Sequence, residues 1–148
     1  MIRRLIVIIA LIAAPLFAQT VPTPEQFLGY KLGDRFTPYS RIVDYFNALA
    51  AKSSLITIHQ FGETYEHRPL ILAEIASPKN RNVNPIDFSR SGPAVVWLAY
   101  GVHGNETSSS EAAMEVASTL LNDPASAKIL ENLVVVIDPL QNPDGRER

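Results

Sequence analysis

Two side chains with metal-binding chemistry, His103 and Glu106, follow an apolar run over residues 94–100. They stand three positions apart in a turn that contains Gly101 and Gly104, which permit backbone shapes that other residues resist. Zinc accepts neutral imidazole and carboxylate ligands, and a catalytic zinc site uses three protein ligands and a water. We therefore predict that His103 and Glu106 bind one metal ion, Zn2+.

The same segment also has a purely structural interpretation. Asn105 or Thr107 can cap the helix that follows, and Glu106 can complement the positive end of its dipole. A His and an acid at this spacing also occur by chance, so the spacing alone does not distinguish a metal site from a helix start. The other two histidines are not expected to be ligands, because His59 faces solvent in its strand pattern and His67 lies in a hairpin turn.

The elements that must position this pair follow from the periodicity of the chain. Apolar residues at helical spacing predict an amphipathic helix over residues 40–52. Two β-branched runs joined by a short polar turn predict an antiparallel hairpin, and a later strand–helix–strand pattern predicts a right-handed crossover with parallel strands. The expected ranges are strands at 55–61, 70–76, 94–100 and 133–137, helices at 106–121 and 125–130, and a turn at 142–145.

These elements predict an α/β fold, with a mixed, mostly parallel sheet and flanking helices. The strand at 94–100 is continuously apolar, so we expect it to be buried on both faces. The strand at 133–137 has the composition of an interior strand but would form an exposed apolar edge of so small a sheet. We therefore expect an incomplete domain. Open α/β sheets bind ligands beyond the carboxyl ends of their strands, where His103 and Glu106 would lie.

Composition limits the classes of protein that need to be considered. The chain has 148 residues, 47% hydrophobic and 19% charged, which is the composition of one globular domain. The formal net charge is −2 and there is no basic patch, so nucleic acid is not an expected partner. Cysteine is absent, so any zinc must be held by His and carboxylate groups.

The N-terminus predicts export. Residues 1–18 combine a short positive region with an apolar stretch, and a polar segment follows, which predicts a secretory signal peptide cleaved after Ala18. The alternative is an uncleaved membrane anchor, but the apolar run is shorter than the about 20 residues of a bilayer span. We expect a secreted or periplasmic protein with no stable membrane span after signal cleavage. Residues 19–37 are expected to form an extended segment leading into the domain.

Three landmarks give the chain a resemblance to a known family. They are Gly62–Leu70 between two predicted strands, Gly101–Glu106 with the His-x-x-Glu pair, and Pro139–Gly145. They resemble, in this order, the Gly-x-Ser/Thr-x-Glu-Gly-Arg-Pro segment, the Gly-x-His-x-x-Glu zinc motif and the Asn-Pro-Asp-Gly turn of the zinc metallocarboxypeptidases, the carboxypeptidase A-like M14 peptidases. The resemblance covers residues 36–148, and His67 replaces the Gly that the family has at its position.

The resemblance implies that residues 38–148 are the N-terminal part of a zinc carboxypeptidase-like α/β/α catalytic domain. It implies a hydrolase that cleaves C-terminal peptide or peptide-like amide bonds in substrates with a free C-terminal carboxylate. His103 and Glu106 would be the first two zinc ligands, and Asn142–Gly145 would shape the active-site side of the sheet. The third ligand, a His, and the general base, a Glu, are expected beyond Arg148. The chain alone is then expected to lack a catalytic residue and to be inactive.

Two other functions remain open from the sequence. The aspartoacylase and succinylglutamate desuccinylase group consists of zinc deacylases with a His-Gly-Asn-Glu core similar to residues 103–106, and these enzymes act on small N-acyl amino acids. A secreted, truncated pseudo-peptidase kept for binding is the non-enzymatic alternative. The signal peptide, the hairpin and the Asn-Pro-Asp-Gly turn favour the carboxypeptidase over the deacylase.

Overall fold

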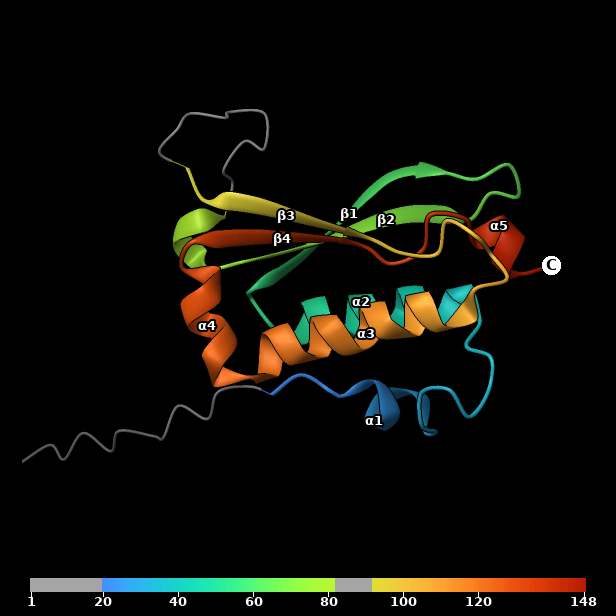
Figure 1. Ribbon diagram of the computed structural model, residues 1–148, viewed down its shortest axis with the longest axis horizontal. Coiled ribbons are helices and arrows are strands. Elements are labelled where there is room, and N and C mark those ends of the chain that lie inside the picture. The colour runs from blue at the N-terminus through green and yellow to red at the C-terminus, as the bar shows by residue number, and fades with distance from the viewer. Residues whose placement is uncertain (1–19, 82–91) are drawn as a thin grey trace, which may run out of the picture.

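The computed structural model of the protein describes residues 20–81 and 92–148 (Figure 1). The predicted signal peptide, residues 1–18, lies outside these residues. The elements are α1 (Pro24–Leu28), α2 (Tyr39–Lys52), β1 (Ile56–Glu63), β2 (Pro69–Ala76), the 3-10 helix η1 (Pro78–Asn80), β3 (Ala94–Ala99), α3 (Thr107–Asn122), α4 (Pro124–Leu130), β4 (Leu133–Asp138) and α5 (Pro143–Arg146).

Four strands form one mixed sheet in the order β1-β2-β4-β3. Strand β2 pairs antiparallel with both β1 and β4, whereas β3 pairs parallel with β4. The predicted mixed sheet with flanking helices is confirmed, but among the described strands the sheet is not mostly parallel. The short β1–β2 turn joins an antiparallel pair and the helical crossover through α3 joins the parallel pair. The placement of β4 beside β2 adds a second antiparallel pair, so antiparallel pairs are in the majority.

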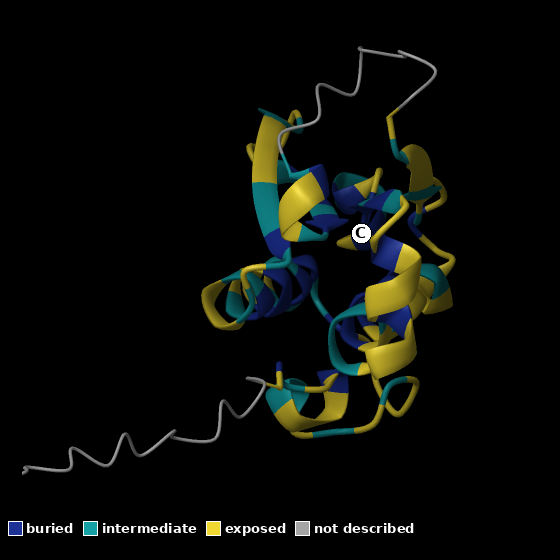
Figure 2. Ribbon diagram, turned by 90° about the vertical axis from the view of Figure 1, so that its left-hand side faces the viewer, coloured by how far each residue is buried: buried dark blue, intermediate teal, exposed yellow. Residues whose placement is uncertain are grey.

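Helices α2 and α3 lie side by side on one face of the sheet (Figure 1). Their apolar residues recur about every three to four positions and face the sheet, as the sequence pattern predicts for α2. Figure 2 shows buried residues on the inner sides of the helices and exposed residues on the outer sides. The core contains Ile42, Tyr45, Phe46 and Leu49 from α2, Ala113, Met114 and Ala117 from α3, and Ile71, Ala73, Ile75, Val135 and Ile137 from the sheet.

The interior composition of residues 133–137 agrees with the position of β4, and the exposed apolar edge expected for that strand is wrong, because β3 lies at the edge instead. Strand β4 is interior, between β2 and β3, whereas β3 is the edge strand. The expectation that β3 is buried on both faces is wrong in the described chain, since Val95, Val96 and Trp97 are 42%, 37% and 62% exposed. A continuous apolar run indicates a strand that can be buried on both faces, but the described residues do not cover both faces of β3.

The segment before α2, which we call the N-terminal arm (residues 20–37), is not simply extended as predicted, because it contains α1. The arm is fastened to both long helices. The amide of Val21 donates to Asn122 Oδ1 at 3.0 Å, and the Tyr45 hydroxyl donates to the Pro22 carbonyl at 3.0 Å. Among the described helices, none is long and apolar enough to cross a membrane.

Candidate metal centre

The turn that carries the predicted ligands (residues 101–106, the ligand turn) leaves the carboxyl end of β3. Pairing with β4 continues one residue beyond the strand, where the Tyr100 amide donates to the Asp138 carbonyl at 2.9 Å. Gly101 then adopts a left-handed conformation with φ 63°, which turns the chain away from the sheet and favours glycine. The ligand turn therefore lies at the sheet end where α/β proteins bind their ligands.

The side chains of His103 and Glu106 meet on this turn. Nδ1 of His103 lies 3.2 Å from Oε1 of Glu106, and the two side chains are 68% and 61% exposed. Zinc bonds of about 2.0–2.2 Å at a tetrahedral angle place two ligand atoms about 3.3–3.5 Å apart. The two atoms, now at hydrogen-bond distance, would therefore need to separate only slightly to share one ion. Their exposure leaves room for a further ligand and a water.

The capping predicted by the structural alternative for this segment is absent from the described chain, although Glu106 does lie at the positive end of the helix dipole. Glu106 itself is the N-cap residue of α3, and no side-chain capping hydrogen bond is made there. Neither Asn105 nor Thr107 therefore caps the helix. The Glu106 carboxylate is directed to His103 rather than to backbone amides.

Within residues 20–81 and 92–148, no group of three or more His, Cys, Asp or Glu side chains is arranged to hold a metal ion. His59 lies on β1, at the opposite edge of the sheet from β3, with Nε2 3.3 Å from Glu74. His67 lies in the β1–β2 turn with Nδ1 3.6 Å from Glu63. The described residues thus bring together two candidate ligands, and both other histidines have carboxylate neighbours elsewhere.

The turn that begins at Asn142 packs directly on the ligand turn. The Asn142 amide donates to the Gly101 carbonyl at 3.1 Å, and its side-chain Nδ2 donates to the Val102 carbonyl at 3.3 Å. A Cβ placed on Gly104 would lie 2.0 Å from the carbonyl carbon of Gly145, so the two backbones are in close contact. The third sequence landmark therefore contacts the backbone on both sides of His103.

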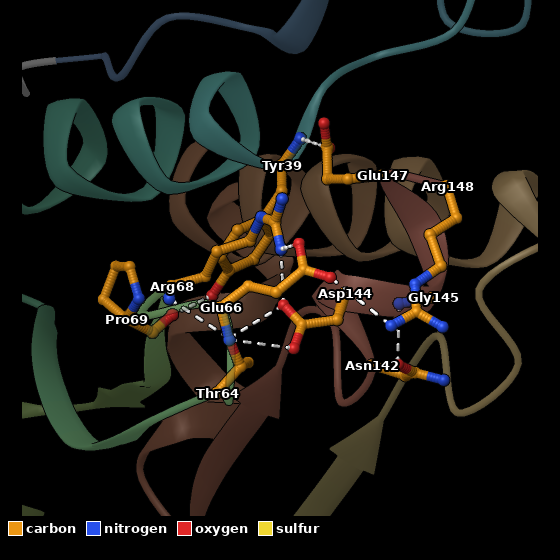
Figure 3. A network of polar contacts seen from close by, with 10 residues as sticks. All are labelled: Tyr39, Thr64, Glu66, Arg68, Pro69, Asn142, Asp144, Gly145, Glu147 and Arg148. Carbon is orange, nitrogen blue, oxygen red and sulfur yellow. Dashed lines mark hydrogen bonds and ion pairs between the residues drawn. The ribbon is translucent and has the colours of Figure 1, made fainter.

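The first landmark reaches the same place through Asp144 (Figure 3). Its carboxylate accepts hydrogen bonds from the Thr64 hydroxyl at 2.8 Å and the Glu66 amide at 3.3 Å, and it forms an ion pair with Arg68. Desolvation raises the pKa of Asp144, but these hydrogen bonds and the Arg68 charge outweigh it and hold that pKa below its usual value. The hydrogen bond from Arg68 also lowers the pKa of Glu66. All three landmarks therefore meet at one end of the sheet.

His67 occupies an unusual backbone conformation in the first landmark. In the part of the chain that the structure describes, it is the one non-glycine residue with positive φ, at 59°. Left-handed backbone costs a residue with a Cβ roughly 1–2 kcal/mol. A Gly was expected at this position, and the left-handed backbone is the physical reason for that preference.

Sequence reasoning missed a buried polar cluster behind the ligand turn. Arg146 and Glu111 are 4% and 7% exposed, and Thr37 is fully buried with them. The Thr37 hydroxyl donates to Glu111 Oε1 at 3.0 Å, and the Arg146 guanidinium donates to the Thr37 carbonyl. A signal for this cluster was present, because Glu111 falls on the apolar face of α3 beside Met114, where an unpaired charge would be costly.

The fold and the site together define an α/β protein with a His–Glu turn at the carboxyl end of a strand. The family model described as zinc carboxypeptidase matches residues 42–148. The chain belongs to this family.

Relatives and solved structures agree with that assignment. The chain is 30% identical over 105 residues to mouse carboxypeptidase A2, covering 67% of this chain and 22% of the relative. It is 31% identical over 109 residues to mouse cytosolic carboxypeptidase 6, covering 72% and 19%. Carboxypeptidase A from Helicoverpa armigera superimposes with a TM-score of 0.63 at 22% identity, covering 77% of this chain and 26% of that one. Thrombin-activatable fibrinolysis inhibitor gives a TM-score of 0.64 at 15% identity, covering 76% and 27%.

The structural likenesses show the fold, and they agree with the expectation of an incomplete carboxypeptidase-like domain. The chain spans about a fifth of the length of the curated relatives it matches.

Proposed function

We propose that the complete gene product is an exported, zinc-dependent metallocarboxypeptidase that hydrolyses the C-terminal peptide or peptide-like amide bond of its substrate. The observation that carries this proposal is the 3.2 Å approach of His103 Nδ1 to Glu106 Oε1 on an exposed turn at the end of β3. Membership of the zinc carboxypeptidase family supports it. His103 and Glu106 would hold Zn2+ as two of its three protein ligands.

The chain's own residues have defined tasks in this chemistry. Zinc, when bound, polarises the scissile carbonyl and lowers the pKa of its water. His103 must present a neutral imidazole and Glu106 an ionised carboxylate, because these are the forms that bind a metal ion. The exposure of both side chains leaves the terminal peptide bond and its carboxylate access to this turn.

We also propose that the 148-residue chain by itself binds zinc weakly and has no turnover. Two protein ligands fall short of the three that a catalytic zinc site uses. The third ligand and the general base would come from residues beyond Arg148. Measurable peptidase activity in pure 148-residue protein, lost in His103→Ala, would overturn this part of the proposal.

The central test uses the complete gene product. Zinc content and hydrolysis are measured for the wild type, His103→Ala and Glu106→Gln, with His59→Ala as the matched control because His59 lies at the other edge of the sheet. Each ligand variant is expected to lose zinc and to lower the rate at least 100-fold, because an open site with one ligand fewer holds the ion poorly. The control is expected to match the wild type.

Substrate choice separates the proposed activity from the other functions. A peptide with a free C-terminal carboxylate is compared with its C-terminal amide and with a set of N-acyl amino acids. The proposal expects release of the last residue from the free peptide and little release from the amide. Hydrolysis of N-acyl amino acids alone would show a deacylase instead, and binding of peptides without hydrolysis would show a pseudo-peptidase.

Export is tested separately, since it rests on residues 1–18 of the sequence. Expression with and without these residues, followed by fractionation and N-terminal sequencing, is expected to show an exported form that begins at Gln19. Retention of the uncleaved protein in the membrane fraction would favour the anchor over the signal peptide.

A further inference from the structure

Arg146 is a charged residue with an unusual position for its type. It follows the Asn-Pro-Asp-Gly turn directly, yet its side chain is 0% exposed. The neighbouring Arg148 has a side chain that is 77% exposed and that reaches Glu66 at the surface. Because a fully enclosed guanidinium cannot reach a peptide in solvent, Arg146 does not bind substrate in this conformation. Its contacts must be explained within the fold.

The guanidinium of Arg146 joins two segments that are distant in sequence. Its Nε and Nη2 donate to the Thr37 carbonyl at 3.1 and 2.9 Å, and its Nη1 donates to the Thr107 carbonyl at 3.1 Å. The guanidinium also lies over the Phe36 ring, 4.6 Å from the ring centre. The rigid, planar set of donors in arginine suits this arrangement, in which two carbonyl groups are held at fixed positions.

The buried charge is balanced within the same cluster. The Glu111 carboxylate lies 3.8 Å from Arg146 Nη2, and it accepts hydrogen bonds from the Gly33 amide and the Thr37 hydroxyl, each at 3.0 Å. Each ion therefore has a partner of opposite charge and polar neighbours, which is the condition under which charges are tolerated in a core. The cluster fixes Arg146 in one orientation.

Thr107 is the residue directly after Glu106 and the first residue of α3. A hydrogen bond to its carbonyl therefore fixes the backbone at the Glu106 end of the ligand turn. Within the turn, next to His103, Gly104 packs against Gly145, the residue before Arg146. One short segment of chain thus holds the backbone beside both candidate ligands.

We propose that Arg146 is a positioning residue for the metal site, which holds Glu106 in the geometry for zinc by fixing the backbone at Thr107. This inference rests on the proposed function, because it assigns a role toward the same zinc ion. It adds a residue that touches neither metal nor substrate and acts through the start of α3. Outer contacts of this kind determine how well the direct ligands are oriented.

The test compares Arg146→Met with Arg148→Met in the complete gene product. The second variant removes an arginine two residues away that is exposed, so it controls for loss of charge. Zinc affinity is measured by competition with a chromophoric chelator at a temperature well below unfolding. Arg146→Met is expected to weaken zinc binding about 10–100-fold, the usual effect of losing a supporting contact, and Arg148→Met is expected to match the wild type.

A second measurement separates positioning from general stability. Hydrogen exchange of the metal-free protein is followed over residues 102–109 and over the later turns of α3. The proposal expects faster exchange in the ligand turn and the first turn of α3 in Arg146→Met, with unchanged exchange further along. Wild-type zinc affinity and wild-type exchange in these residues would overturn it, even if the variant melts at a lower temperature.

Two further outcomes remain decisive. If Arg146→Met does not fold, Arg146→Lys keeps a positive charge opposite Glu111 but loses the planar donors, and it is expected to weaken zinc binding several-fold. Wild-type affinity in that variant would overturn the proposal. If the wild type binds no zinc, the proposed function fails, and hydrogen exchange alone then decides whether Arg146 holds the ligand turn.

Discussion

The contact between Gly104 and Gly145 gives the sharpest prediction from this structure. A Cβ at position 104 would lie 2.0 Å from the Gly145 carbonyl carbon, 2.3 Å from its oxygen and 2.4 Å from the Arg146 amide nitrogen. Favourable contacts between carbon atoms lie at about 3.5–4.0 Å, so Gly104→Ala requires one backbone to retreat by more than about 1 Å. No flexible side chain is available to absorb the overlap at these three atoms.

The size of the effect follows from this geometry. Overpacking usually costs about 1–3 kcal/mol, and a collision with backbone on the opposite side places Gly104→Ala at the upper end, about 3 kcal/mol. At roughly 4 °C per kcal/mol for a chain of this size, the melting temperature should fall by roughly 12 °C. The retreat would also separate the two turns, so zinc binding should weaken at least about 10-fold.

Thermal unfolding of the metal-free protein and chelator competition measure these two effects. Gly62→Ala is the matched control, because its nearest neighbour would be Leu70 Cδ1 at 3.9 Å and its φ is not in the left-handed region. We expect that control to change the free energy of unfolding by less than about 1 kcal/mol, because the added methyl group would make only an ordinary contact with Leu70, although Gly62 lies at an irregularity of the β1–β2 pairing. A melting temperature of Gly104→Ala within 2–3 °C of the control would refute the reasoning, since the two backbones would then have room to separate.

Three further predictions follow from the described contacts. His67→Gly should stabilise the fold by roughly 0.5 kcal/mol, because relief of left-handed strain of about 1–2 kcal/mol exceeds the flexibility cost of glycine of about 0.5–1 kcal/mol. Denaturant unfolding measures this gain. The control His67→Ala keeps a Cβ and should not be more stable than the wild type. Asp144→Asn should lower the melting temperature at pH 6–7, and the difference from wild type should shrink below about pH 4. A carboxyl group whose folded pKa is lowered contributes stability that disappears as pH falls through that pKa. A difference in melting temperature that is constant from pH 3 to pH 7 would contradict this. The isolated 148-residue chain should self-associate through the exposed apolar edge of β3, and Trp97→Lys should reduce the association seen by analytical ultracentrifugation, since charge on an edge strand opposes pairing.

Periodicity predicted the local elements well. The apolar residues of α2 recur at helical spacing, so the range 40–52 agrees with the observed Tyr39–Lys52. The break at residues 122–124 likewise agrees with the end of α3 and the start of α4, where Asp123 caps the second helix. These features depend on neighbours in sequence, which is why the sequence alone identifies them.

Features that depend on distant residues were harder to predict. The edge position of β3 depends on which strands flank it, and its apolar composition pointed to burial instead. Helix α1 has five residues, too few to produce a periodic pattern. Arg146 looks like an ordinary surface residue after a turn, because its partners Thr37 and Thr107 are 109 and 39 positions away. The sequence shows each of the three landmarks, but only the fold shows that they lie together at one end of the sheet.

The fastening of the N-terminal arm also sets an order of events when the protein is made. Thr37 leaves the ribosome 109 residues before Arg146, its buried hydrogen-bond partner. At about 5–20 residues per second, the arm waits roughly 5–20 s for that partner to be synthesised. Contacts this distant in sequence carry a large loop-closure cost and form late. The contact between Thr37 and Arg146 is therefore among the last to form, and the Thr37 end of the arm remains accessible to chaperones while the rest of the chain is being translated.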